Sequence, residues 1–396
     1  MGTGERAADH AVMRRVNRAV VLDVIRSTEA SSRSAIAEAT GLAKPTVGLI
    51  VDELMTAGLV AEVGRGEPGT VGGRPPVLLA FNARSSFLAG VHVGVRRTTV
   101  VVADALGTPL VERTMKTPAG RPPAALDRIA AAISDAAAGV GAGTGMIAAV
   151  GVCLPGLVAT GGLLSRASAL GWRDVPVAHL LGDRLGVPVV ADNAARTALL
   201  AETRLGAARG ERDVVLVYAG VGIGAAAVVN GQLVHGAGGL AGELGHVRVC
   251  ANGQRCSCGK TGCLETVASA DAVICAAAAR WKRKAPRPAG ELTIGDIAAA
   301  AAAGDQIAVE ILGEAGRDLG TAAAWMVNLL DPACVVLSGC VGEAGPALAG
   351  PFEQAMTSDA RPVRVVVSEL GEAAELQGML LMAREHASAD IRIVTR

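Results

Sequence analysis

The sequence predicts an α/β protein built from two modules: an N-terminal winged helix-turn-helix over residues 1–82 and a duplicated α/β domain over residues 83–396. Apolar residues recur at helical spacing as far as residue 56, and two short apolar runs joined by a Gly- and Pro-rich loop follow. After that loop, β-branched runs with short turns give way to helical stretches, and this alternation occurs twice. The class of each module follows from these patterns.

The first module begins with a helical pattern. Val16, Val20 and Val24 recur at four-residue steps, with Val21 and Ile25 beside them, and this pattern predicts an amphipathic helix over residues 11–27. Ser34 is expected to cap the short helix that follows, because a serine hydroxyl can accept a bond from an unpaired N–H of the first turn.

A second short helix is expected after a tight turn at Gly41, with Pro45 in its first turn, where a missing N–H costs little. Its apolar positions recur at i, i+3, i+4 and i+7, and they are Val47, Ile50, Val51 and Leu54. Two short helices joined by a Gly-containing turn form a helix-turn-helix, whose second helix enters the DNA major groove. A generic helical hairpin is the alternative.

The runs 59–63 and 77–81 are predicted to be strands, and the Gly- and Pro-rich loop between them is typical of the wing of a winged helix. Arginines on such a loop suit contacts with phosphates or with the minor groove. The sequence therefore predicts a DNA-binding surface made by Lys44, Thr46, Arg65 and Arg74.

The second module repeats one pattern. Strands are expected at 87–95, 98–104, 109–114 and 146–156 around a helix at 124–138, and again at 213–220, 223–234 and 333–339 around a helix at 305–330. Two rounds of hairpin-rich sheet followed by helices indicate a duplicated α/β domain.

One cluster of metal-ligand residue types interrupts the second round, with the spacing His246-x9-Cys256-x-Cys258-x4-Cys263. Thiolates and an imidazole are the ligands of tetrahedral zinc, and four protein ligands leave no open position, as in structural sites. The sequence therefore predicts a structural zinc ion. Ordinary thiols and a disulfide pair are the alternatives.

Composition limits the remaining possibilities. The 37 basic and 37 acidic residues balance, so a polyanionic partner requires a local basic patch. The first residues lack an apolar signal core, and no window of 18 apolar residues free of charge occurs. We therefore expect a cytoplasmic protein with no membrane partner.

Several motifs resemble those of the ROK family (repressors, open reading frames and kinases), and specifically its winged-helix regulators of the xylose- and N-acetylglucosamine-repressor type. These motifs are GGRP at 72–75, GVHVGV at 90–95, GVCLPG at 151–156, ALGW at 169–172, ADNAA at 191–195, GVGIG at 220–224, GLAGELGH at 239–246 and CSCGKTGCLE at 256–265. The resemblance implies an actin-like, ribonuclease-H-like sugar-kinase fold, a sugar-binding cleft and a zinc site beside it.

The resemblance also implies that the sugar contacts fall on Asn193, Glu243, His246 and Glu265. Carboxylates suit this task because charge-assisted hydrogen bonds to hydroxyls are about twice as strong as neutral ones. His246 is expected to use one ring nitrogen for zinc and the other for a hydroxyl. A surface acid in a glycine-rich loop is the alternative interpretation of Glu243.

The same resemblance argues against catalysis. Where the family's kinases carry an Asp-x-Gly-Gly-Thr turn around the ATP phosphates, this sequence reads HVGVR at 92–96. The Asn-Asp pair that supplies the kinases' base becomes Asn193-Ala194, and Asp192 is expected to point elsewhere. We therefore expect no enzyme activity; a sugar kinase with a helical appendage is the alternative.

The expected function is that of a sugar-responsive repressor of genes for carbohydrate uptake or catabolism. Its expected partners are double-stranded operator DNA and a small carbohydrate effector, and the expected assembly is a homodimer or a dimer of dimers. Three points stay open: the identity of the sugar, whether ligand binding is retained, and whether the ligand releases or promotes DNA binding.

Overall fold

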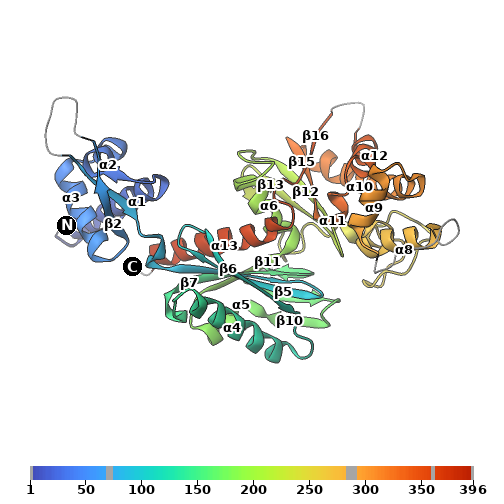
Figure 1. The fold of residues 1–396 in the computed structure, drawn as a ribbon, viewed down its shortest axis with the longest axis horizontal. Coiled ribbons are helices and arrows are strands. Elements are labelled where there is room, and N and C mark those ends of the chain that lie inside the picture. The colour runs from blue at the N-terminus through green and yellow to red at the C-terminus, as the bar shows by residue number, and fades with distance from the viewer. Residues whose placement is uncertain (1–2, 68–74, 282–291, 358–361, 394–396) are drawn as a thin grey trace. The chain divides into compact units, whose positions relative to one another are not determined.

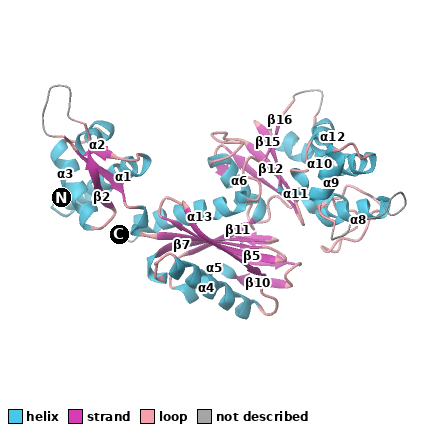
Figure 2. Cartoon of the chain, viewed as in Figure 1, coloured by secondary structure: helices cyan, strands magenta, loops and turns pink. Residues whose placement is uncertain are grey.

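The computed structural model of this chain describes residues 3–67, 75–281, 292–357 and 362–393. The chain forms two compact units, shown in Figures 1 and 2: Met1–Phe87 with Asp104–Thr108, and Leu88–Ala103 with Pro109–Arg396. Among the described residues, no helix has both the length and the apolar character needed to cross a membrane.

The first unit is a winged helix-turn-helix. Its elements are α1 (Thr3–Ser27), β1 (Ser31–Ser32), α2 (Arg33–Thr40), α3 (Lys44–Thr56), β2 (Val60–Arg65) and β3 (Val77–Phe81). The strands form one sheet in the order β1-β3-β2, which packs with the three helices around a small aliphatic core. All four apolar positions predicted for the second helix, Val47, Ile50, Val51 and Leu54, are buried in this core.

One prediction for this unit is wrong in detail. Ser32, not Ser34, caps α2, because its hydroxyl accepts the Ala35 N–H at 3.2 Å. The helix predicted over residues 11–27 is part of α1. Val21 and Ile25 are buried and Val24 packs against the same core, whereas Val16 and Val20 are 53% and 40% exposed.

The second unit contains two five-stranded sheets. Each sheet belongs to one lobe of the unit. The strands of the first lobe are β4 (Phe87–Val93), β5 (Arg97–Asp104), β6 (Pro109–Lys116), β7 (Ile147–Leu154) and β11 (Val189–Asn193), in the order β6-β5-β4-β7-β11. The strands of the second lobe are β12 (Val214–Ala219), β13 (Ile223–Val229), β14 (Gln232–Leu233), β15 (Cys334–Ser338) and β16 (Arg364–Val367), in the order β14-β13-β12-β15-β16. Numbered along the chain, both sheets have the order 3-2-1-4-5, so the predicted duplication is confirmed.

Helices cover both sheets. In the first lobe, Figure 1 shows α4 (Pro122–Gly139) and α5 (Val177–Leu185) on one face and α13 (Ala373–Ile393) on the other. A small sheet adjoins this lobe, formed by β8 (Leu157–Ala159), β9 (Leu163–Ala167) and β10 (Trp172–Pro176). The helices of the second lobe are α6 (Ala194–Arg204), α7 (Glu265–Ala268), α8 (Ala270–Trp281), α9 (Ile294–Ala302), α10 (Gln306–Leu330), α11 (Gly339–Gly342) and α12 (Pro346–Met356).

The junction of β11 and α6 is central to the unit. Strand β11 pairs in parallel with β7 of the first sheet, and α6 follows it directly and packs against β12 and β13 of the second. Residues at this junction can therefore bond to segments of both lobes.

Helices α10 and α12 pack closely because glycines line their contact. A Cβ atom added at Gly316 would lie 2.3 Å from the Leu348 carbonyl oxygen, and one at Gly320 would lie 2.2 Å from that of Phe352. Both distances are shorter than any real contact, so the two helices cannot keep this separation with larger residues.

Gly316→Ala should therefore lower the stability of the second unit by about 1–3 kcal/mol, because the helices must separate to admit a methyl group. Gly313→Ala, in the same helix α10, is the matched control. Its Cβ would lie no closer than 3.4 Å to any neighbouring atom, and alanine favours the helix by about 0.5–1 kcal/mol. Thermal denaturation measures the stability of both variants. Equal midpoints for the two would contradict the close contact of α10 with α12 at Gly316.

Candidate functional site

The four predicted metal ligands converge. The candidate ligand atoms of His246, Cys256, Cys258 and Cys263 all lie within 4.8 Å of one another. Cys256 Sγ is 3.6 Å from His246 Nδ1, and Cys258 Sγ is 3.6 Å from Cys263 Sγ. Three thiols and an imidazole in this arrangement could hold a metal ion.

Turns with glycines shape the loop that carries the cysteines. The Gly259 N–H donates to the Cys256 carbonyl at 2.9 Å, and Gly259 has φ +93°. A Cβ at Gly262, with φ +76°, would lie 1.7 Å from the Cys250 carbonyl oxygen, so only glycine fits there. The spacing of the cysteines therefore follows from backbone turns that bring their side chains to one point.

The pKa values of two of these thiols, Cys258 and Cys263, are shifted in opposite directions. The backbone N–H of Lys260 lowers the pKa of Cys258, whereas burial and the neighbouring Cys258 and Cys256 raise the pKa of Cys263 to about 12. A thiolate at Cys263 is thus unfavourable without a nearby cation. A bound metal ion would supply that cation, since metal ligation requires the deprotonated thiol.

The glycine-rich segment before the cluster lies directly on β13. A Cβ at Gly242 would be 1.9 Å from the Ala225 carbonyl oxygen, and one at Gly245 would be 2.3 Å from that of Ile223. This contact fixes the 3₁₀ turn η3 (Leu244–His246), which follows Glu243.

Glu243, His246 and Glu265 are brought together at this place. His246 Nε2 lies 3.8 Å from Glu243 Oε2, whereas the other ring nitrogen, Nδ1, faces Cys256. Burial and the nearby Glu265 raise the pKa of Glu243 to about 7, although Arg196 opposes the shift. Glu265, at the start of α7, accepts the Ile223 N–H at 3.4 Å. Two carboxyl groups therefore face one region together with the imidazole of His246, which also belongs to the cluster of candidate metal ligands.

Asn193 has a different role in the structure. It is the last residue of β11, it is buried, and its side-chain oxygen caps α6 by accepting the Arg196 N–H at 2.9 Å. Among the hydrogen bonds of the described residues, none joins Asn193 to Glu243, His246 or Glu265. Within the described part of the chain, no hydrogen bond uses its amide N–H₂ group.

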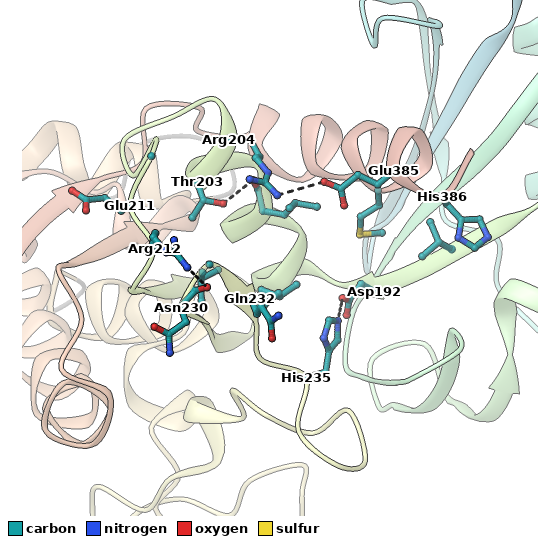
Figure 3. Close-up of a pocket in the computed structure, with 17 residues that line it drawn as sticks. Asp192, Thr203, Arg204, Glu211, Arg212, Asn230, Gln232, His235, Glu385 and His386 are labelled. Atoms are coloured by element: carbon teal, nitrogen blue, oxygen red, sulfur yellow. Dashed lines mark hydrogen bonds and ion pairs between the residues drawn. The ribbon is translucent and has the colours of Figure 1, made fainter. Parts of the chain in front are cut away.

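Sequence reasoning missed a buried network next to this group. Asp192 binds both Arg196 and His235, and the pair of Asp192 and His235 is drawn in Figure 3. The i,i+4 spacing of Asp192 and Arg196 on the β11–α6 junction is the only signal that could have indicated it.

The predicted DNA-contacting residues lie on the first unit. Lys44 begins α3 and is exposed, Thr46 is half-buried in its first turn, and Arg65 ends β2 and is exposed. Arg74 lies outside the described residues. Lys44 also lines a concavity of about 400 Å³ with Ser32, Arg33, Ser34, Pro76 and Val77, so the start of α2 and the base of the wing adjoin it.

The ROK family model matches residues 88–386, which is most of the second unit. The chain belongs to the ROK family. It is similar to a xylose repressor from Bacillus spizizenii, at 27% identity over 96% of this chain and 97% of the repressor.

Two solved structures of ROK proteins resemble the chain to different extents. A ROK family transcriptional regulator, a homologue of the E. coli MLC protein, matches with a TM-score of 0.79 and 26% identity over 97% of this chain and 98% of its own. A ROK family glucokinase from Streptomyces griseus, in complex with glucose and AMPPNP, matches with a TM-score of 0.68 and 29% identity over 76% of this chain and 100% of its own.

Proposed function

We propose that this chain is a sugar-responsive, DNA-binding transcriptional regulator that represses genes for carbohydrate uptake or catabolism. The observation that carries the proposal is the extent of the two structural matches. The regulator aligns with 97% of the chain, so its match extends into the winged-helix unit, whereas the glucokinase aligns with only 76%. We place the DNA-binding domain at residues 1–82 and the sensor domain at residues 83–396.

The first unit has the features that DNA binding requires. The start of α3 is the part of a helix-turn-helix that contacts base edges, and Lys44 and Thr46 lie there. The concavity beside Lys44 is lined by Ser32, Arg33 and Ser34 at the start of α2, where N–H groups and hydroxyls suit a phosphate oxygen. Lys44 and Arg65 are thus candidates for phosphate contacts.

The sensor site is the group formed by Glu243, His246 and Glu265, with Asn193 as an additional donor. Ionised carboxylates are strong acceptors for sugar hydroxyls. His246 Nδ1 faces Cys256 of the candidate metal-ligand cluster, while its Nε2 faces Glu243. A structural zinc ion bound by His246, Cys256, Cys258 and Cys263 would therefore orient the residues that contact the effector.

Phosphoryl transfer is disfavoured at three places. The turn at 92–96 is closed on itself, since the Gly94 N–H donates to the Arg97 carbonyl at 2.9 Å. Asp192 is bound by Arg196 and His235, so both of its carboxylate oxygens already have partners within the chain. Glu343 accepts the Gly339 N–H at 3.0 Å, so the chain's own carboxylate occupies the turn after β15. We therefore propose that the sensor domain is not a kinase.

Purified protein should contain one zinc ion per chain, and Cys258→Ser should lose most of it, because the remaining three ligands bind zinc more weakly. Elemental analysis after purification without chelator measures the content. Cys275→Ser, which changes an exposed thiol of α8 outside the cluster, should keep full zinc. Full zinc in Cys258→Ser, or less than half an equivalent in the wild type, would refute the assignment.

DNA binding should occur as a homodimer on an inverted repeat, because one winged helix reads too few base pairs for specificity. Lys44→Ala should weaken binding to DNA from the gene's own upstream region and reduce the salt slope by about one unit. Lys116→Ala, an exposed lysine on β6 of the second unit, is the control and should bind normally. Fluorescence anisotropy across salt concentrations measures both, and unchanged binding by Lys44→Ala would place the DNA surface elsewhere.

An effector sugar should change operator affinity by roughly 5–150-fold, the usual range of coupling between two sites. Pentoses, hexoses, N-acetylhexosamines and their phosphates are the panel to screen, and we expect release of DNA. Glu265→Ala should lose the response but keep DNA binding, while Glu112→Ala, an exposed acid on β6, should keep both. A full response in Glu265→Ala, or no response to any sugar in the wild type, would remove the support for this sensor site.

A further inference from the structure

The segment 235–243 carries Glu243 from the second sheet to the turn η3, and on its way it contacts the first lobe. Gly239 makes the contact possible. It has φ +71°, and a Cβ at this position would lie 2.5 Å from Ala159 Cα and 2.7 Å from the Val158 carbonyl oxygen of β8. The backbone of the segment and the backbone of β8 therefore touch directly.

Arg196 joins the two sides of this contact. Its side chain is fully buried, and its Nη1 donates to the carbonyls of Gly239 at 3.1 Å and Ala241 at 3.4 Å. Its Nη2 donates to the Val158 carbonyl at 2.7 Å. One guanidinium thus binds the segment of the second lobe and β8 of the first.

Asp192 and His235 complete the arrangement. Asp192 Oδ1 lies 2.5 Å from both Nε and Nη2 of Arg196, which compensates the buried positive charge. Asp192 Oδ2 lies 3.0 Å from His235 Nε2, at the beginning of the same segment. The segment is therefore bound at His235 through Asp192, and at Gly239 and Ala241 through Arg196.

The residue type at this position matters. A planar guanidinium directs its N–H groups in several fixed directions, whereas a lysine ammonium cannot reach a carboxylate and three carbonyls with the same geometry. A buried arginine is retained only when its charge and its donors are satisfied, because desolvation otherwise costs more than the contacts return. All three nitrogens of Arg196 have such partners.

We propose that Arg196 is a positioning residue: with Asp192 and His235 it clasps the segment 235–243 to β8 and so fixes Glu243 in the sensor site. The inference rests on the proposed function only for the use of Glu243 as an effector contact. The clasp has one solvent-facing member, His235, which lines the cavity of about 1000 Å³ drawn in Figure 3.

Hydrogen exchange of the full-length, zinc-loaded protein tests the clasp without any effector. The amides of Gly239 and Ala241 bond within the segment, to the carbonyls of Gly236 and His235, and report its opening. In Arg196→Met these amides and those of 157–159 should exchange about tenfold faster or more, since charged hydrogen bonds are lost on both sides. Arg196→Lys should give an intermediate increase.

Arg184→Met is the matched control. Arg184 also pairs with a carboxylate, Asp127 at 2.7 Å, and also donates to two backbone carbonyls, those of Leu180 and Pro123, but within the first lobe. The Arg184→Met variant should leave the hydrogen exchange of the segment 235–243 unchanged even if it lowers the melting temperature. If Arg196→Met does not fold, Asp192→Asn and His235→Gln serve in its place and should each speed exchange of the same amides.

Wild-type exchange of the segment in folded Arg196→Met and Arg196→Lys, or in Asp192→Asn and His235→Gln, would overturn the proposal. A second readout separates positioning from bulk stability. With the same sugar panel, Arg196→Lys should need a roughly tenfold higher sugar concentration while its sugar-free operator affinity stays normal. Faster exchange with no sugar response in the wild type would leave the clasp in place and reject the effector role of Glu243.

Discussion

The close packing of the glycine-rich segment on β13 is the contact on which the site depends. Gly242 and Gly245 leave no room for a side chain between their backbone and the carbonyls of Ala225 and Ile223. Because the backbone lies so near the sheet, the positions of Glu243 and His246 relative to β13 are fixed, and both residues lie close to Glu265. The loop that carries the cysteines contacts His246 through Cys256. A larger residue at either glycine would displace Glu243 together with His246, and so would disturb both the sensor site and the candidate metal site.

The two lobes are tied together near the same place. The chain passes from the first sheet to the second at the β11–α6 junction, where Asp192, Asn193 and Arg196 are buried. Asn193 caps α6, Asp192 neutralises Arg196, and Arg196 reaches segments of both lobes. The buried polar side chains of this junction are thus all used in holding the two lobes together.

Much of this arrangement could be predicted from the sequence because it depends on local patterns. The helix spacing of Val47, Ile50, Val51 and Leu54 and the clustering of His246 with three cysteines are visible in a single chain. The clasp is not, because its partners are backbone carbonyls at positions far from Arg196 in sequence, and carbonyls carry no residue signature. The cap of α2 was misassigned for a related reason, because Ser32 and Ser34 stand two positions apart and only the folded backbone selects Ser32.

We propose that sugar binding changes the affinity for DNA and is not followed by phosphate transfer. The most direct measurement is a sugar titration of the zinc-loaded protein with upstream DNA and MgATP present, recording operator binding and ATP consumption together. We expect at least one sugar to shift operator binding while ATP consumption stays at the sugar-free level. Sugar-dependent ATP turnover at about 1 s⁻¹, with operator binding unchanged, would contradict it.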